Sequence, residues 1–250
     1  MIPREFFGGI GRFVRDEAEQ LGFRLQPTII VAWVCFALAI PYYHPGGEWF
    51  WRIVSWLGLS AQISYLQHIW LGPEFAIQAV GSLVVILLLR ESPRAYGLGL
   101  GDWRFGLKAT GLCYLLYAPL FVIFCTSHGF AQYYGTLANT ITTTRKFFMW
   151  EVPAGFFFMV KTEFFFRGFL LFGMKKYFGV YAAIIATMIP FVVWHFNKPE
   201  IETFGSFPVG LALAYLAVRT GSIWYGLLLH WSIAVLLSAV AIWMALSSAT

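Results

Sequence analysis

The chain has 250 residues, of which 59% are hydrophobic, 20% are aromatic and only 12% are charged, and its formal net charge is +5. A soluble domain carries about twice this share of charged residues. The composition therefore excludes an ordinary soluble enzyme and favours a protein embedded in a lipid bilayer. The positive charges form no basic patch that would suggest binding to nucleic acid.

The first 26 residues are amphipathic and rich in charge, and they contain no apolar core of their own. A cleavable signal peptide needs such a core. We therefore predict that residues 1–26 form an N-terminal interfacial segment that lies along the cytoplasmic side of the membrane, ahead of a transmembrane domain at 27–250.

Apolar segments that are long enough to cross a bilayer of roughly 30 Å follow along the rest of the chain. They predict an all-α fold, a polytopic transmembrane helical bundle of about seven or eight spans. The segments are 28–43, 74–90, 105–126, 147–173, 179–196, 204–218 and 222–246, with an ambiguous one near 48–66.

The lysines and arginines predict how this bundle is oriented. With seven crossings, 11 basic residues fall on the side of the N-terminus and four fall on the opposite side. The positive-inside rule then places the N-terminus in the cytoplasm and the C-terminus outside. We expect an integral protein of a bacterial inner (plasma) membrane, with the loop that carries Glu202 facing outward and the long connection 129–145 positioned to cover a site.

Two charged residues lie inside a predicted span. Glu163 and Arg167 are four residues apart in a stretch that is otherwise aromatic and aliphatic, so on a helix they share one face. A carboxylate at bilayer depth costs several kcal/mol at least, and it is kept only when it is paired, faces a polar cavity or takes part in chemistry. The sequence predicts a buried ion pair here.

Two histidines lie on later spans. His195 follows a run of apolar residues near the end of one span, and His230 lies within the next but one. Each could be a structural histidine that bonds a neighbouring helix. Together with Glu163 and Arg167, they supply the base, orienting group and hydrogen-bond donors of a buried polar site.

At these residues the chain resembles the CPBP family (CAAX protease and bacteriocin-processing, Abi) of intramembrane glutamic-type proteases. The family signatures are Glu-Glu-x-x-x-Arg, Phe-x-x-x-His and His-x-x-x-Asn on three successive helices. Here they read as Thr162-Glu163-Phe164-Phe165-Phe166-Arg167, Phe191-Val192-Val193-Trp194-His195 and His230-Trp231-Ser232-Ile233-Ala234. The similarity covers a core at about 147–240.

The resemblance implies that Glu163, Arg167, His195 and His230 form the catalytic site. In the family, the first glutamate of the first motif activates water and the asparagine of the third stabilises the oxyanion, and these positions are Thr162 and Ala234 here. Glu163 is then the expected base, and Glu202 is the alternative if the chain beyond His195 stays helical through Pro199.

The resemblance implies an intramembrane endopeptidase that cleaves near the C-terminal tail or membrane anchor of a protein substrate, in which glutamate and histidine activate water. The departures at Thr162 and Ala234 leave a second hypothesis, a catalytically inactive member that acts as a binding, scaffold or immunity protein.

We expect no cofactor. One glutamate and two histidines could hold zinc, but the paired spacing that favours a zinc site is missing, so zinc is the minority alternative. The expected partners are the bilayer and a tailed or anchored protein, which a cavity lined by Phe164, Phe165, Phe166 and Phe191 would suit.

Overall fold

The computed structural model of the protein describes residues 20, 22, 24–44, 47–57, 72–125, 130, 133–134, 143–196 and 198–247. These residues form helices and turns, and no strand is found among them, which confirms the all-α prediction. Most of the predicted interfacial segment 1–26, the second half of the ambiguous segment 48–66 and most of the connection 129–145 lie outside the described residues. The predictions made for those three regions stay predictions.

The helices follow the predicted apolar segments closely, and three of them contain short π-helical stretches. In chain order they are α2 (Leu25–Tyr43), α3 (Glu48–Trp56), α5 (Pro73–Phe75), η2 (Ala76–Gly81), α6 (Ser82–Leu88), η3 (Pro93–Tyr96), α7 (Trp103–Cys125), α9 (Thr144–Lys146), η4 (Phe147–Glu151), α10 (Val152–Glu163), η5 (Phe164–Phe172), α11 (Gly173–Val193), α12 (Glu200–Thr220) and α13 (Trp224–Ser247).

Within the described part of the chain, five helical segments are long and apolar enough to cross a membrane, and α5, η2 and α6 together form a shorter apolar helix at Pro73–Leu88. The longest segment, Thr144–Val193, has 50 residues and covers the predicted span 147–173 and most of the predicted span 179–196. It bends at Gly179, whose backbone has φ 77° and ψ 172°. Glycine adopts a positive φ without a steric penalty. The two predicted spans are therefore two helical parts of one segment, joined at this bend.

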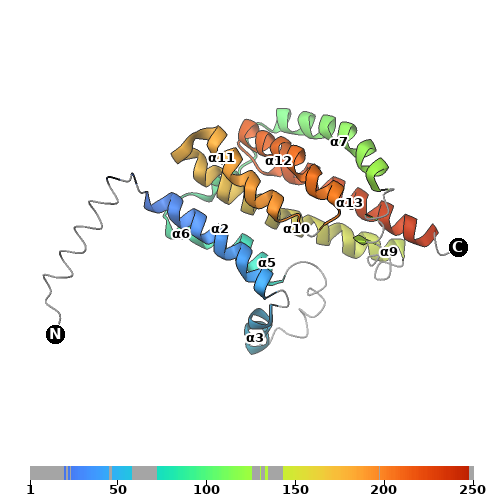
Figure 1. Ribbon diagram of the computed structural model, residues 1–250, viewed down its shortest axis with the longest axis horizontal. Helices are drawn as coiled ribbons and strands as arrows, with labels where there is room; N and C mark the ends of the chain where they lie inside the picture. The colour runs from blue at the N-terminus through green and yellow to red at the C-terminus, as the bar shows by residue number, and fades with distance from the viewer. Residues whose placement is uncertain are drawn as a thin grey trace, which may run out of the picture.

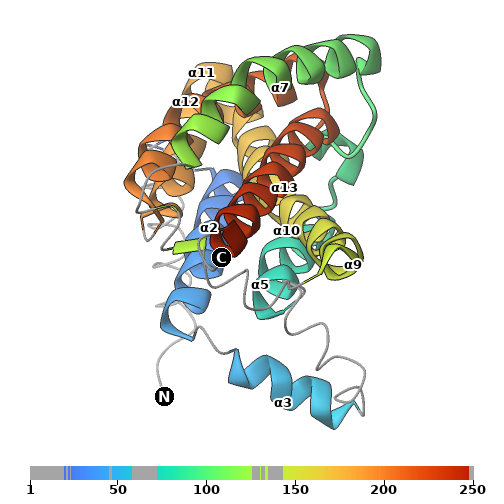
Figure 2. The same cartoon turned by 90° about the vertical axis from the view of Figure 1, so that its right-hand side faces the viewer.

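The helices pack in a bundle around α10 and η5. In Figure 1, α7, α12 and α13 lie on one side of this bundle and α2 and α6 on the other, while α3 projects away from it in both Figure 1 and Figure 2. Every residue from 161 to 174 is buried, because α2, α6, α11 and α12 all pack against η5. The stretch that carries Glu163 and Arg167 is therefore at the centre of the protein and faces no lipid.

One end of the bundle is closed by the connection between α6 and α7. The backbone N–H of Ile223 donates to the Gly97 carbonyl (3.0 Å), and that of Asp102 donates to the Thr220 carbonyl (2.9 Å). Gly101 permits this approach, since its φ is +52° and a Cβ there would lie 1.9 Å from the Thr220 oxygen. The connection between α6 and α7 and that between α12 and α13 thus meet at one end.

Candidate active site

The predicted pair of Glu163 and Arg167 is present and completely buried. An Nη of Arg167 lies 3.2 Å from Glu163 Oε1, and neither side chain has any exposed surface. The other Nη donates to the Gly210 carbonyl of α12 at 3.4 Å, and the guanidinium carbon lies 3.8 Å from the centre of the Phe191 ring. Arg167 therefore ties η5 to both α11 and α12.

The same carboxylate oxygen holds His230 on α13. Its Nδ1 lies 2.7 Å from Glu163 Oε1. A carboxylate oxygen accepts hydrogen bonds, so Nδ1 carries the proton and Nε2 is left for another partner. Glu163 Oε1 is thus shared by a guanidinium and an imidazole, a geometry in which the carboxylate fixes the orientation of the histidine ring.

His195 is held differently, by backbone instead of by a charge. It lies in the turn after α11, and its Nδ1 is 2.7 Å from the carbonyl oxygen of Phe191. A carbonyl can only accept, so Nδ1 again carries the proton and Nε2 has a free lone pair. The hydroxyl of Thr203 donates to the His195 carbonyl at 2.6 Å, which fixes the turn.

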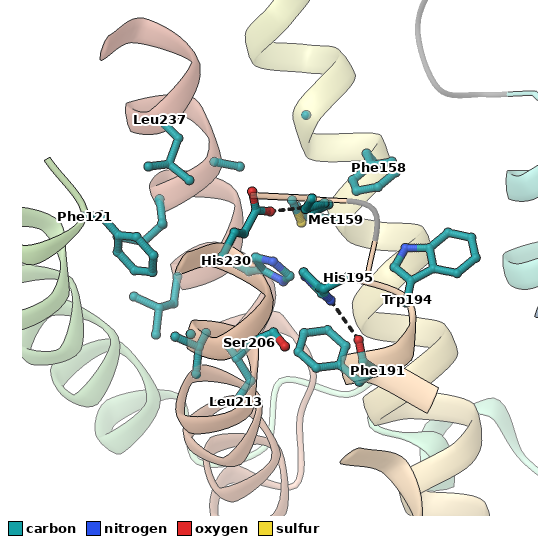
Figure 3. A pocket seen from close by; sticks show the side chains of 18 of the residues that line it. Phe121, Phe158, Met159, Phe191, Trp194, His195, Ser206, Leu213, His230 and Leu237 are labelled. Atoms are coloured by element: carbon teal, nitrogen blue, oxygen red, sulfur yellow. Dashed lines mark hydrogen bonds and ion pairs between the residues drawn. The ribbon is translucent and has the colours of Figure 1, made fainter. Parts of the chain in front are cut away.

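The two histidines line one cavity of about 790 Å³. Figure 3 shows their rings next to each other, with Phe191 below them, Phe121 and Leu237 on one side, and Phe158 and Trp194 on the other. The prediction that both histidines belong to one buried site agrees with this geometry. Most of the wall is apolar, which suits an apolar helix or a lipid tail.

The prediction for the phenylalanines was wrong at three of four positions. Phe191 lines the cavity, whereas Phe164, Phe165 and Phe166 belong to the central hydrophobic core. The reason is that η5 is packed on all sides, so consecutive side chains in it point into different parts of the core. The cavity is lined instead by residues of α7, α10, α12 and α13.

Glu163, Arg167 and Thr162 are not among the side chains that line the cavity. Glu163 is wholly buried behind His230, and its Oε2 has no hydrogen-bond partner. Thr162 is buried as well, and its hydroxyl donates to the Phe158 carbonyl one turn earlier, at 2.9 Å. Ala234, by contrast, does line the cavity.

The cavity also contains a second cluster of polar residues, and the sequence analysis predicted few of them. Glu202 was considered, but only if a helix continued through Pro199. The structure ends α11 at Val193 and begins α12 at Glu200, and the intervening turn still brings Glu202 to the cavity. Its Oε1 lies 2.5 Å from Lys198 Nζ, and its Oε2 accepts from the Tyr134 hydroxyl at 2.7 Å.

Lys198, Tyr134 and Glu74 also line the cavity and had no assigned role. Lys198 could have been found from its position three residues after His195. Glu74 could not, because it is far away in the chain and reaches the site through an ion pair with the buried Lys161, at 2.5 Å. Among the described residues, no group of three or more His, Cys, Asp or Glu side chains is arranged to hold a metal ion.

Comparison with known proteins gives a family match for part of the chain. No curated protein and no solved structure gave a match. Residues 144–236 match the family described as Type II CAAX prenyl endopeptidase Rce1-like, a range that overlaps the predicted core and contains Glu163, Arg167, His195 and His230. Over this core, the chain is similar to the CAAX-protease (CPBP) family, which supports the resemblance seen in the sequence.

Proposed function

We propose that the protein is an intramembrane endopeptidase that cleaves near the C-terminal tail or membrane anchor of a protein substrate. The observation that carries this proposal is the cavity of about 790 Å³, which His195 and His230 reach from two different elements. Its mostly apolar wall would accept a membrane-embedded segment. The Nε2 atoms of His195 and His230, which are not used in the hydrogen bonds to Phe191 and Glu163, would then lie next to the peptide bond.

His195 is the better placed of the two to activate water. Its Nδ1 proton is donated to a backbone carbonyl, and that partner carries no charge that would favour a protonated ring. The ring therefore stays neutral, and Nε2 can take a proton from water while the water oxygen attacks the scissile carbonyl. The same nitrogen can then return the proton to the leaving amine, which completes hydrolysis of the peptide bond.

His230 has the complementary role. The Glu163 carboxylate holds the ring through Nδ1, so that Nε2 faces the cavity, where its protonated form can donate a hydrogen bond to the oxyanion that forms during attack. Arg167 holds Glu163 in place from the opposite side. Glu163 is then a positioning residue that acts through His230, although the sequence favoured it as the base.

Glu202 is the second carboxylate to consider for water activation, since it lines the cavity and Glu163 does not. Both of its oxygens are already bound, one by Lys198 and one by Tyr134, which makes it a weaker base than a free carboxylate. We therefore assign water activation to His195, with no metal or other cofactor taking part.

Thr162 and Ala234 support a second candidate, an inactive family member that binds a membrane partner. The hydroxyl of Thr162 is bonded within its own helix, and Ala234 offers no donor to the cavity. Under this reading the cavity still accepts an apolar segment, but no bond is cleaved.

We propose that the protein lies in a bacterial inner membrane with its N-terminus in the cytoplasm. The excess of lysine and arginine on the side of the N-terminus supports this orientation. The proposed partners are the bilayer and an anchored or tailed protein, and no nucleic acid.

The proposal is tested by replacing the two histidines. Purified protein in nanodiscs is incubated with prenylated CAAX-type peptides, and fragments are followed by mass spectrometry. His195→Ala and His230→Ala should each reduce cleavage at least 10²-fold, without loss of folded protein in a melting assay, while His44→Ala, an exposed histidine, should cleave like wild type. A zinc chelator should leave the rate unchanged. Full activity in either cavity variant would remove that histidine from the mechanism.

A further inference from the structure

Ser206 is a buried polar residue of the cavity that the reaction described above does not use. It lines the cavity from α12, and only 4% of its surface is exposed. The oxyanion of acyl transfer is usually held by more than one hydrogen-bond donor, and the His230 ring supplies one. We propose that the Ser206 hydroxyl is the second donor to this oxyanion. This inference rests on the proposed function and deepens it.

The position of Ser206 follows from the face that α12 turns to the cavity. Glu202, Ser206, Val209 and Leu213 all line the cavity, and their spacing of four, three and four residues places them on one side of a helix. Ser206 is one turn after Glu202 and is followed by apolar side chains. Within this face, its hydroxyl is the polar group that lies deeper in the bundle than the carboxylate of Glu202.

The Phe191 ring connects this face of α12 to the two histidines. A Cβ at Gly210, one turn after Ser206, would lie 2.9 Å from the Phe191 ring, so the helix and the ring are in close contact. The centre of that ring is 4.7 Å from the centre of the His195 ring and 6.3 Å from that of His230. Figure 3 shows Ser206 beside Phe191 and below both imidazoles. The three polar side chains therefore border the same part of the cavity.

The hydroxyl of Ser206 can change its acceptor during the reaction. It donates to the Thr203 carbonyl, three residues earlier, at 2.7 Å. A serine hydroxyl can rotate to suit its partner, and a hydrogen bond to an ionised acceptor is roughly twice as strong as one between neutral groups. The exchange becomes favourable only when negative charge forms on the substrate oxygen, so the interaction stabilises the transition state more than the bound substrate.

The same helix that carries His230 does not supply this donor. Ala234, one turn after His230, lines the cavity with a methyl group. Ser238 lines it as well, but eight residues of helix place it about 12 Å from His230 along the axis. A second donor close to the His230 ring must therefore come from a neighbouring element, and Ser206 meets this requirement.

The other donors near the histidines are bound to a carboxylate. The Lys198 ammonium and the Tyr134 hydroxyl lie 2.5 and 2.7 Å from the oxygens of Glu202. Either group would have to exchange one charged acceptor for another to bind an oxyanion. Ser206 exchanges a neutral carbonyl for a charged oxygen, so it gains more from the exchange.

The test removes the hydroxyl and follows binding of the charged intermediate separately from binding of the substrate. Ser206→Ala removes the donor, and Ser206→Thr keeps a hydroxyl. Ser232→Ala is the matched control, because the Ser232 hydroxyl also donates to a carbonyl three residues earlier, at 2.9 Å, but does not line the cavity. Values of kcat and KM are measured in nanodiscs with a prenylated CAAX-type peptide, and thermal melts check that each variant is folded.

Binding is measured by fluorescence anisotropy with two labelled probes. One is a prenylated peptide with a phosphinate in place of the scissile bond, which carries the negative charge and tetrahedral shape of the intermediate. The other is the normal peptide, measured in the His195→Ala background so that binding needs no turnover. The contrast between the probes distinguishes a donor to the oxyanion from a residue that only shapes the cavity.

We expect Ser206→Ala to lower kcat about 10²-fold with KM changed less than twofold. It should weaken phosphinate binding by a similar factor and leave binding of the normal peptide unchanged. Ser206→Thr should retain at least a tenth of the wild-type kcat, and Ser232→Ala should match wild type in every measurement.

The results separate this role of Ser206 from the proposed function. Wild-type kcat in Ser206→Ala would overturn the role of Ser206 and leave the endopeptidase standing, and so would an equal loss of affinity for both probes. A wild-type protein that cleaves no peptide, yet binds the phosphinate more tightly than the normal peptide and loses this preference in Ser206→Ala, would contradict the endopeptidase and leave the hydrogen bond from Ser206 intact.

Discussion

Two ion pairs in this protein have the same spacing in the sequence and different surroundings. Glu163 and Arg167 are four residues apart and entirely buried, with 3.2 Å between their charged groups. Lys198 and Glu202 are also four residues apart, and they lie 2.5 Å from each other at the wall of the cavity. A spacing of four residues brings both pairs together, but it does not decide what either pair does.

The surroundings decide this. The buried pair has no access to water or to a ligand, so its effect reaches the cavity only through the His230 ring that Glu163 holds. The pair at the cavity wall is partly exposed, so water weakens the attraction between its charges. We therefore expect the first pair to control catalysis and folding, and the second to affect both less.

The largest effect is expected from removing the charge of Glu163. Glu163→Gln keeps the size of the side chain and an acceptor for His230 but removes the negative charge that holds the His230 ring and Arg167, and it should lower kcat by 10²- to 10⁴-fold. Glu202→Gln should lower kcat less than tenfold. If the two effects were reversed, Glu202 would be the group that activates water and His195 would have a supporting role.

The next effect concerns stability. Arg167→Ala leaves the Glu163 carboxylate buried without its cation, which typically costs about 3–5 kcal/mol, and it also removes the contact with the Gly210 carbonyl. Lys198→Ala should cost about 1 kcal/mol or less, since this pair borders the cavity. Thermal melts in detergent measure both. An Arg167→Ala protein that melts like wild type would show that the buried pair contributes nothing to folding.

A smaller change is expected at Thr162, which separates the enzyme from the inactive scaffold. If His195 and His230 suffice for hydrolysis, Thr162→Glu should change the rate by no more than about tenfold, and it should lower the melting temperature because a carboxylate replaces a buried hydroxyl. If wild type cleaves nothing and Thr162→Glu cleaves a CAAX-type peptide, the inactive reading is correct. Thr162→Gln is the control for side-chain size.

The smallest effect is expected at Glu91, at the closed end of the bundle. Partial burial acts to raise the pKa of Glu91, but hydrogen bonds from Lys176 and Tyr96 outweigh it and hold the pKa below its usual value. The stabilisation is therefore complete above pH 4.5 or so and is lost as the pH falls through the lowered pKa. Glu91→Gln should cost about 0.5–1 kcal/mol at pH 7 and nothing in acid, which melts at several pH values can show.

The sequence by itself determined the fold class and indicated which polar residues lie within the spans. Long apolar segments predict helices because a bilayer leaves few other ways to satisfy the backbone. The pairing of Glu163 with Arg167 follows from helix geometry, and the two histidines follow from the cost of polar groups at that depth.

Only the tertiary structure decided which side chains face the cavity. The helices are apolar all round, so no amphipathic face indicates their rotation, and the π-helical stretch of η5 changes the phase of the residues within it. That is why Phe164, Phe165 and Phe166 were placed wrongly and why Glu163 turned out to lie behind His230. Tyr134 joins Lys198 and Glu202 from a segment that is distant in the chain, which no local spacing can indicate.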